Sequence, residues 1–167
     1  MSRFKGVFEA LEHVSGCDLD LVVIGGGSSE QNQLFRKKAD SLGVDVQILS
    51  NLNSTEMCAI FRNARAVVGF SHGEAFGLTP VEAMAIGTPP LFVDFGGYTD
   101  TIVDGVNGRL LGRGDLEAWR KAFEQAKDEE TRESWAREGV TRIQELGLTP
   151  ERHVDRLKKS IDSITTV

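Results

Sequence analysis

Residues 66–82 read AVVGFSHGEAFGLTPVE, a sequence in which an apolar run, a loop and a helix start follow one another. The run Ala66–Phe70 is short and contains β-branched residues, which predicts a buried strand. Thr79 followed by Pro80 predicts the start of a helix, because threonine caps helices and proline is favoured at their first position. The free N–H groups of such a helix start can hold a phosphate or a sugar hydroxyl.

The same alternation of short apolar runs and amphipathic stretches continues on both sides of this unit. It predicts one α/β domain over residues 1–167, a doubly wound parallel sheet with helices on both faces. Ligands of such sheets bind at the carboxyl ends of the strands. Ser28, Ser54 and Asp115 are the expected N-caps of three helices. The expected strands are 20–24, 44–49, 66–70, 90–94 and 108–111, and the expected helices are 4–13, 28–42, 54–64, 79–86, 98–103, 115–146 with a break near 127–131, and 150 to about 164.

The composition is that of a soluble globular protein. Of the 167 residues 40% are hydrophobic and 26% are charged, and the net charge of −6 comes with scattered basic residues. Duplex nucleic acid is therefore not an expected partner, because its phosphate backbone requires clustered Lys and Arg. No apolar run reaches about 18 residues and no signal-peptide core is present, so we expect a cytoplasmic protein. Trp119, Phe123 and Trp135 fall at helical positions and are expected in the core.

The cysteines, histidines and first glycine cluster give weak signals. Cys17 and Cys58 stand apart without a Cys-x-x-Cys spacing, which predicts two reduced thiols in or near the core. The three histidines are too dispersed to predict a metal site, and His72 is expected to be a solvated loop residue. Residues 25–30 lack the last glycine of a dinucleotide-binding fingerprint.

Two carboxylates, Glu74 and Glu82, flank the expected helix start. Carboxylates can accept bidentate hydrogen bonds from vicinal hydroxyls, so this pair beside a phosphate-binding helix start suits a sugar nucleotide. Each carboxylate also has a simpler explanation. Glu82 stands three residues after Thr79, which is the spacing of a capping box, and Glu74 could be a solvated charge in a glycine-flanked loop. The spacing alone leaves these alternatives open.

The residues around the two carboxylates resemble the motifs of the family-4 retaining glycosyltransferases. The resemblance covers nearly the whole chain and implies the nucleotide-sugar-binding half of the GT-B architecture. Three stretches carry it: Glu74 and Glu82 with seven residues between them, similar to the E-x7-E motif; Gly96-Gly97 with residues 100–108, similar to the GG-x-x-E-x-V-x-D-G-x-N-G run; and Lys5-Gly6, similar to the K-G pair.

The resemblance implies transfer of a hexose from a nucleoside-diphosphate sugar to a sugar or lipid acceptor, with retention of configuration. As catalytic residues, Glu74 would lie against the transferred sugar and Lys5 would neutralise the leaving diphosphate. Glu82 would bind the ribose hydroxyls. The resemblance implies no metal and no other cofactor, because protein groups take over the neutralising role. The other implied donor contacts are Phe76, Gly77, Leu78 and Thr79 at the sugar and diphosphate, Gly96 and Gly97 beside the hexose, and Ser50 and Leu52 at the nucleobase.

The sequence departs from the family pattern in several respects. Arg3 stands only two residues before Lys5 and does not match the family's arginine, and Asp100 replaces a glutamate. The N-terminal GT-B domain, which would bind the acceptor, has no counterpart. Neither has a first strand that would lie between those at 21–24 and 66–70, so we expect two unpaired apolar edges. These features predict a fragment of a longer enzyme, cytoplasmic or peripheral to the membrane.

Two other functions stay open at this point. Nucleotide-sugar epimerases share the GT-B fold, although their sequences do not usually contain a stretch like residues 74–80. A non-catalytic sugar-nucleotide-binding module would need only this half of the architecture.

Overall fold

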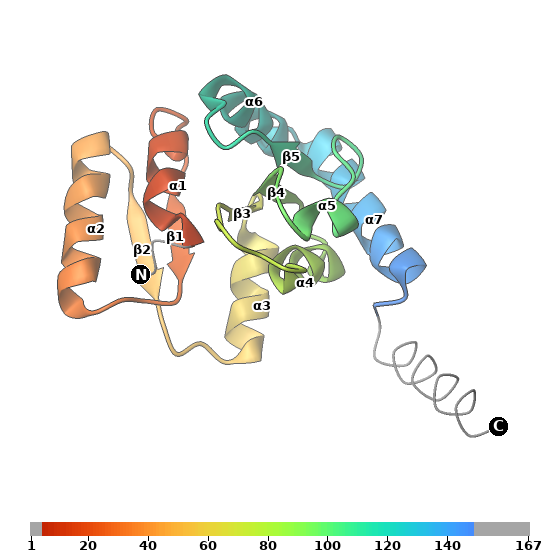
Figure 1. Ribbon diagram of the computed structural model, residues 1–167, viewed down its shortest axis with the longest axis horizontal. Helices are drawn as coiled ribbons and strands as arrows, with labels where there is room; N and C mark the ends of the chain where they lie inside the picture. The colour runs from red at the N-terminus through yellow and green to blue at the C-terminus, as the bar shows by residue number, and fades with distance from the viewer. Residues whose placement is uncertain (1–4, 149–167) are drawn as a thin grey trace.

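The computed structural model describes residues 5–148, in which strands and helices alternate along the chain (Figure 1). The predicted α/β class is confirmed, and the predicted break in the long C-terminal helical region falls at Asp128. The helix predicted from residue 150 lies outside the described residues. The strands are β1 (Leu21–Ile24), β2 (Val46–Leu49), β3 (Val67–Gly69), β4 (Pro90–Val93) and β5 (Arg109–Leu111), and the helices are α1 (Val7–Val14), α2 (Ser29–Leu42), α3 (Ser54–Asn63), α4 (Leu78–Ile86), α5 (Tyr98–Thr101), α6 (Leu116–Lys127) and α7 (Glu129–Leu146).

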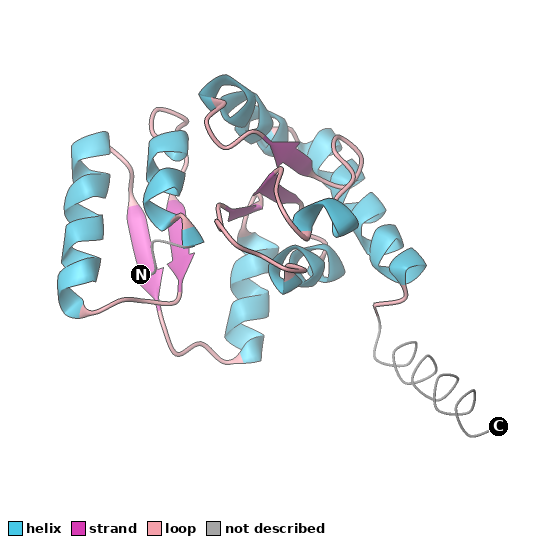
Figure 2. Cartoon of the chain, in the orientation of Figure 1, coloured by secondary structure: helices cyan, strands magenta, loops and turns pink. Residues whose placement is uncertain are grey.

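All strand pairs are parallel, but the strands form two separate sheets (Figure 2). β1 pairs with β2 in one sheet. In the other, β4 lies between β3 and β5, with Leu91 opposite Val68 on one side and Arg109 on the other. Within the described part of the chain no strand joins β1 to β3, the place where the sequence analysis expects two unpaired edges.

Helices cover the strands on both faces (Figure 1). On one face α1 contacts α2 and α6, whereas on the other α4 contacts α3 and α7. β4 is buried at every position, as expected of a parallel strand covered on both faces. The strands β1 and β3, which border the interruption, are only partly buried.

Aromatic side chains form much of the core, as their spacing predicts. Trp119 is fully buried and stacks on Phe70, with the ring centroids 4.3 Å apart. Phe123 and Trp135 are buried as well. Because Phe70 directly follows β3 and Trp119 lies on α6, this stack holds α6 against the carboxyl end of β3.

The first two predicted helix caps have different outcomes. α2 begins as predicted, since Ser28 and Gln31 form a capping box. α3 is capped by Asn53 and not by Ser54, a correction of one residue. The Asn53 Oδ1 accepts from the Glu56 N–H at 3.0 Å, and the Glu56 carboxylate accepts from the Asn53 N–H at 2.8 Å. This reciprocal pair satisfies two N–H groups, which a cap at Ser54 would not do here.

Candidate functional site

The helix α4 begins one residue earlier than its sequence predicts. It starts at Leu78 after Gly77, whose φ of 82° lets the chain enter the helix through a left-handed turn. Thr79 is therefore inside the first turn and is not the N-cap. In the described structure no side chain caps α4, so the proposed capping box of Thr79 and Glu82 is wrong. The N–H groups of this helix start have no side-chain acceptor and can bind a ligand oxygen.

Glu74 and Lys5 form an ion pair near the carboxyl end of β3. The Lys5 Nζ lies 3.2 Å from the Glu74 Oε2. The Glu74 side chain is 24% exposed and that of Lys5 is 64% exposed, so the carboxylate is held while the ammonium group extends into solvent. Exposed pairs of this kind contribute about 0–1 kcal/mol, so a bound anion can draw Lys5 away at little cost.

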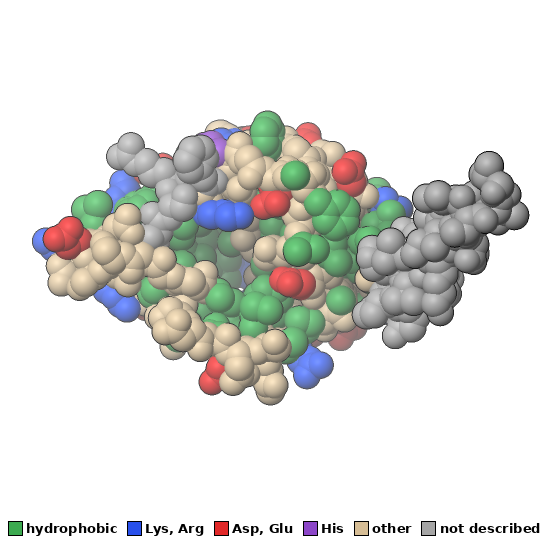
Figure 3. All heavy atoms as spheres, turned by 60° about the horizontal axis from the view of Figure 1, so that its bottom comes forward, with side chains coloured by type: hydrophobic (Ala, Val, Ile, Leu, Met, Phe, Trp, Pro, Cys, Tyr) green, Lys and Arg blue, Asp and Glu red, His purple; other side chains and the backbone are tan. Residues whose placement is uncertain are grey.

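Both residues line a hollow of about 1050 Å³ between the two sheets. Thr79 and Glu82 of α4 line the same hollow. Figure 3 shows this face of the molecule, with hydrophobic side chains inside the hollow and basic and acidic side chains at its rim. The structure therefore brings four of the predicted site residues around one space, and the two carboxylates share it.

Other predicted donor-binding residues lie beside this hollow or apart from it. Phe76 lies on the loop before α4 and is 38% exposed, and Leu78 is the first residue of α4 and is 65% exposed. Ser50 and Leu52 follow β2, and neither is among the described residues that line the hollow. Ser50 lies near the glycine turn after β1, since a Cβ at Gly26 would be 3.8 Å from the Ser50 Cβ. The predicted nucleobase residues are thus not brought together with the carboxylates.

Gly96 and Gly97 pack directly against the loop that carries Glu74. The Gly97 N–H donates to the Glu74 carbonyl at 3.1 Å. A Cβ at Gly96 would lie 2.5 Å from that carbonyl oxygen, and a Cβ at Gly97 would lie 2.3 Å from the Phe76 Cα. A side chain at either position would push the loop away, so the two glycines help to set the position of Glu74.

Tyr98 supports the same loop from α5. Its side chain is buried and its ring lies edge-on to that of Phe92, with the centroids 4.7 Å apart. A Cβ at Gly77 would lie 2.6 Å from the Tyr98 ring, so the tyrosine fits only against a glycine. Burial raises the pKa of Tyr98 and the charge of Glu74 raises it further, so the phenol stays neutral beside the carboxylate.

Arg113 is a site residue that the sequence analysis misses. Its Nη1 donates to the Phe70 carbonyl at 2.8 Å and to the Glu9 Oε2 at 2.6 Å, and its Nη2 donates to the Ser71 carbonyl at 2.8 Å. The guanidinium therefore holds the carboxyl end of β3 against α1. The sequence signal that could have indicated it is its place just after β5, because the carboxyl ends of parallel strands meet at one edge.

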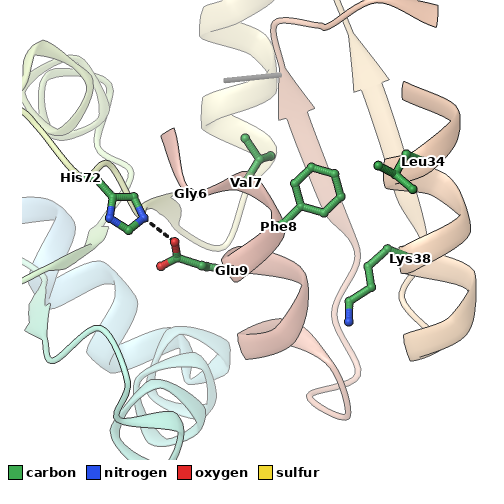
Figure 4. A pocket seen from close by; sticks show the side chains of 7 residues that line it. All are labelled: Gly6, Val7, Phe8, Glu9, Leu34, Lys38 and His72. Carbon is green, nitrogen blue, oxygen red and sulfur yellow. Dashed lines mark hydrogen bonds and ion pairs between the residues drawn. The ribbon is translucent and has the colours of Figure 1, made fainter. Parts of the chain in front are cut away.

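His72 is more than a solvated loop residue, which corrects the prediction from sequence. Its side chain is 42% exposed, yet its Nε2 bonds the Glu9 carboxylate of α1 (Figure 4). Burial raises the pKa of Glu9, but hydrogen bonds from Arg113 and His72 lower it by more, so the net direction is downward. A smaller cavity of about 700 Å³ is lined by the residues labelled in Figure 4, which are Gly6, Val7, Phe8, Glu9, Leu34, Lys38 and His72.

The described residues contain no group of three or more His, Cys, Asp and Glu side chains that could hold a metal ion. Cys17 and Cys58 are free thiols, and Cys17 is buried. No helix among the described residues is long and apolar enough to cross a membrane.

Comparison with known proteins gives one family along most of the chain. The family model for glycosyl transferases group 1 matches residues 1–142. The D-inositol 3-phosphate glycosyltransferase of Corynebacterium aurimucosum is 32% identical over 143 residues, which are 79% of this chain and 34% of that protein. The enzyme of the same name from Corynebacterium diphtheriae is 30% identical over 141 residues, 78% of this chain and 33% of that protein. The chain spans about a third of the length of these curated relatives.

Solved structures show the same fold. Sucrose-phosphate synthase from Thermosynechococcus elongatus has a TM-score of 0.80 at 23% identity, over 98% of this chain and 44% of that chain. HepE from Anabaena, in complex with UDP-glucose, has a TM-score of 0.76 at 20% identity, over 86% of this chain and 42% of that chain. The C-terminal domain of a glycosyl transferase group 1 family protein from Francisella tularensis has a TM-score of 0.71 at 26% identity. The match covers 86% of this chain and 80% of that chain.

The parallel strands and the helices on both faces agree with these matches. The fold is that of a GT-B glycosyltransferase domain. The chain belongs to the glycosyl transferases group 1 family.

Proposed function

We propose that this chain is the donor-binding part of a retaining glycosyltransferase. The reaction is the transfer of a hexose from a nucleoside-diphosphate sugar to a sugar or lipid acceptor, without a metal. The observation that supports it best is the shared hollow, around which Lys5, Glu74 and Glu82 stand next to the uncapped start of α4. The chain spans about a third of its relatives, so the acceptor would bind to a further, N-terminal GT-B domain.

The ion pair between Lys5 and Glu74 suits an exchange of partners when the donor binds. A diphosphate is a stronger partner for Lys5 than one partly exposed carboxylate, and the α4 N–H groups can bind its other oxygens. Glu74 is then free to accept hydrogen bonds from the sugar hydroxyls. During transfer the bond between the anomeric carbon and the diphosphate oxygen breaks, and its electron pair stays on the diphosphate. Lys5 and the helix start stabilise that negative charge, and Glu74 faces the positive charge on the sugar.

Glu82 suits the ribose of the donor. Its side chain is exposed on α4, and it belongs to no helix cap in the described structure. A carboxylate accepts two hydrogen bonds from a vicinal diol such as the ribose 2′ and 3′ hydroxyls. Because Glu74 and Glu82 border one hollow, a single donor can reach both.

Uridine diphosphate sugars are the first donors to test. HepE was solved with UDP-glucose, and the pneumococcal O-GlcNAc transferase GtfA, a further structural neighbour, with UDP and GlcNAc. Thermal unfolding of the chain with UDP-, GDP- and ADP-sugars should show a higher Tm with at least one, since a ligand that binds only the folded state stabilises it. Titration calorimetry then gives its Kd.

The substitutions E74A and E82A test the assignment. Each should weaken donor binding by about tenfold or more, because each removes a charged hydrogen-bond acceptor from the site. E138A is the matched control, since Glu138 is an exposed glutamate on α7 outside the hollow. Unchanged affinity in both E74A and E82A would refute the proposed site. With the donor alone, an epimerised sugar nucleotide would support an epimerase instead.

A further inference from the structure

Residues 70–74 connect β3 to the carboxylate of the site, and this loop is anchored at both ends. The Arg113 guanidinium donates to the Phe70 and Ser71 carbonyls at 2.8 Å each. At the other end, the Gly97 N–H donates to the Glu74 carbonyl at 3.1 Å. Elements that are distant in the sequence therefore hold the backbone of the 70–74 loop at its first and last residues.

His72 anchors the middle of the loop through its side chain. Its Nε2 bonds the Glu9 Oε1, and Figure 4 shows the two side chains pointing toward each other from the loop and from α1. The Arg113 Nη1 lies farther from this nitrogen, at 3.2 Å. An ionised carboxylate only accepts hydrogen bonds, so we assign the proton to the Nε2, which donates to Glu9. The other Glu9 oxygen accepts from Arg113 at 2.6 Å, so one carboxylate holds both partners.

A single glycine separates His72 from Glu74. Gly73 is exposed, and a Cβ at this position would have no atom within 4 Å. Because glycine has more backbone freedom than other residues, Gly73 does little to fix the direction of Glu74. The hydrogen bond from the Ser71 hydroxyl to the Gly73 carbonyl is long, at 3.3 Å. The bond of His72 to α1 is therefore the nearest charged restraint on the loop before Glu74.

This restraint becomes more important when the partner of Glu74 changes. In the free chain the Lys5 Nζ lies 3.2 Å from the Glu74 Oε2, and the Lys5 side chain is 64% exposed. In the proposed reaction Lys5 moves to the diphosphate, so Glu74 loses this partner when it has to face the sugar. Its direction then depends on the backbone that carries it.

We propose that Glu9 and His72 are positioning residues for the transferred sugar, because their hydrogen bond keeps Glu74 directed into the hollow after Lys5 has left it. This role rests on the proposed function, in which Glu74 binds the hexose. Neither Glu9 nor His72 is among the described residues that line the hollow. They act on the donor only through the 70–74 loop.

The first test needs no donor. H72A should loosen the 70–74 loop and so weaken the hydrogen bond from the Gly97 N–H to Glu74. Hydrogen exchange of the Gly97 amide, measured by NMR, should become about threefold to tenfold faster as local opening becomes easier. In H72Q the side-chain amide can still donate to Glu9, so the exchange rate should stay close to that of the unsubstituted chain. An unchanged Gly97 rate in H72A would overturn the proposal.

The second test compares a sugar nucleotide with its nucleoside diphosphate by titration calorimetry. UDP-glucose and UDP are the first pair, and the matching GDP or ADP pair replaces them if only that sugar nucleotide raises the Tm. A loop that occupies the bound position about a tenth of the time lowers the affinity about tenfold. H72A and E9A should therefore weaken UDP-glucose about threefold to tenfold and change UDP by less than about twofold, since UDP has no hexose. A general loss of structure would weaken both ligands.

Three further variants separate positioning from other effects. E12A is the matched control for E9A, because Glu12 also lies on α1 but pairs with Lys38 at 3.3 Å, and it should leave both affinities unchanged. H72Q should keep most of the affinity for UDP-glucose. In the double variant E74A/H72A the affinity should equal that of E74A, since His72 acts through Glu74.

Failure of the positioning role and failure of the proposed function give different results. If the unsubstituted chain binds no member of the UDP, GDP and ADP pairs, the proposed function is wrong and the role of His72 falls with it. If the chain binds a pair, but H72A weakens both members equally, weakens neither, or weakens E74A further, the donor site stands and the positioning role is refuted.

Discussion

The guanidinium of Arg113 connects parts of the molecule that are far apart in the sequence. It bonds two carbonyls at the end of β3 and the carboxylate of Glu9 on α1. The loop that follows β3 carries Glu74, so Arg113 fixes the base of this loop without lining the hollow itself.

The substitution R113K tests this role. Lysine keeps the charge but has no planar fork to reach two carbonyls and a carboxylate at once. We expect the free energy of unfolding, measured with urea, to fall by about 1–3 kcal/mol, the range of hydrogen bonds to charged groups. R137K is the control, because Arg137 lies exposed on α7 and pairs with Glu133 at 3.8 Å. Equal losses in the two variants would contradict the role of Arg113.

Glu9 should make the stability of the chain depend on pH. Its pKa is lowered in the folded chain from the ordinary value of 4.5 by Arg113 and His72, against the effect of burial. Its ionised form therefore stabilises the fold above pH 4.5, and this contribution is lost as the pH falls through the folded pKa.

Urea unfolding between about pH 6 and pH 3 measures this dependence. E9Q removes the titration, so it should lose less stability over this range than the unsubstituted chain. E12Q, on the exposed side of α1, should follow the unsubstituted chain. Parallel curves for E9Q and the unsubstituted chain would rule out this effect of Glu9.

The sequence identifies site residues whose spacing is local and misses those held by distant contacts. Glu74, Glu82 and Lys5 stand in short motifs, and the structure places all three around one hollow. Arg113 and Glu9 are separated by 104 positions, so no local pattern relates them. Whether the three motif residues bind a donor stays a prediction.

The start of α4 depends on Gly77, which packs closely against the ring of Tyr98. Gly77 has a positive φ, and a Cβ at this position would clash with the Tyr98 ring. Gly87, at the end of α4, has a similar φ of 85°, but no atom lies within 4 Å of the position that its Cβ would take. G87A should cost about 1–2 kcal/mol through its backbone conformation alone. G77A should cost about 1–3 kcal/mol more, because Tyr98 must also move. Similar Tm losses in the two variants would contradict the steric argument.

Strands and helices were predictable here because apolar residues recur with the period of each element. The α2 cap follows from a local serine and glutamine, and the break at Asp128 from a local change in pattern. The start of α4 was not predictable from the local sequence. The N-cap is Gly77 and not Thr79, and Gly77 packs against Tyr98, which belongs to α5.

The arrangement of the whole molecule follows the sequence in outline. Alternating strands and helices predict a parallel α/β fold, and the family resemblance predicts the interruption between β1 and β3, where the structure shows two sheets. The hollow extends from this interruption to Glu82. This extent was not predictable from the sequence, because it depends on how the elements around the two sheets pack together.

The division into two sheets has a consequence for local unfolding of the molecule. The β1–β2 layer with α1 and α2 has one strand pair, whereas β4 pairs with a strand on each side and is buried at every position. We expect two cooperative units of unequal stability. In mass-spectrometric deuterium uptake under native conditions, peptides from residues 21–49 should become labelled well before those from residues 90–93. Uniform labelling of both regions would mean that the molecule opens only as one unit.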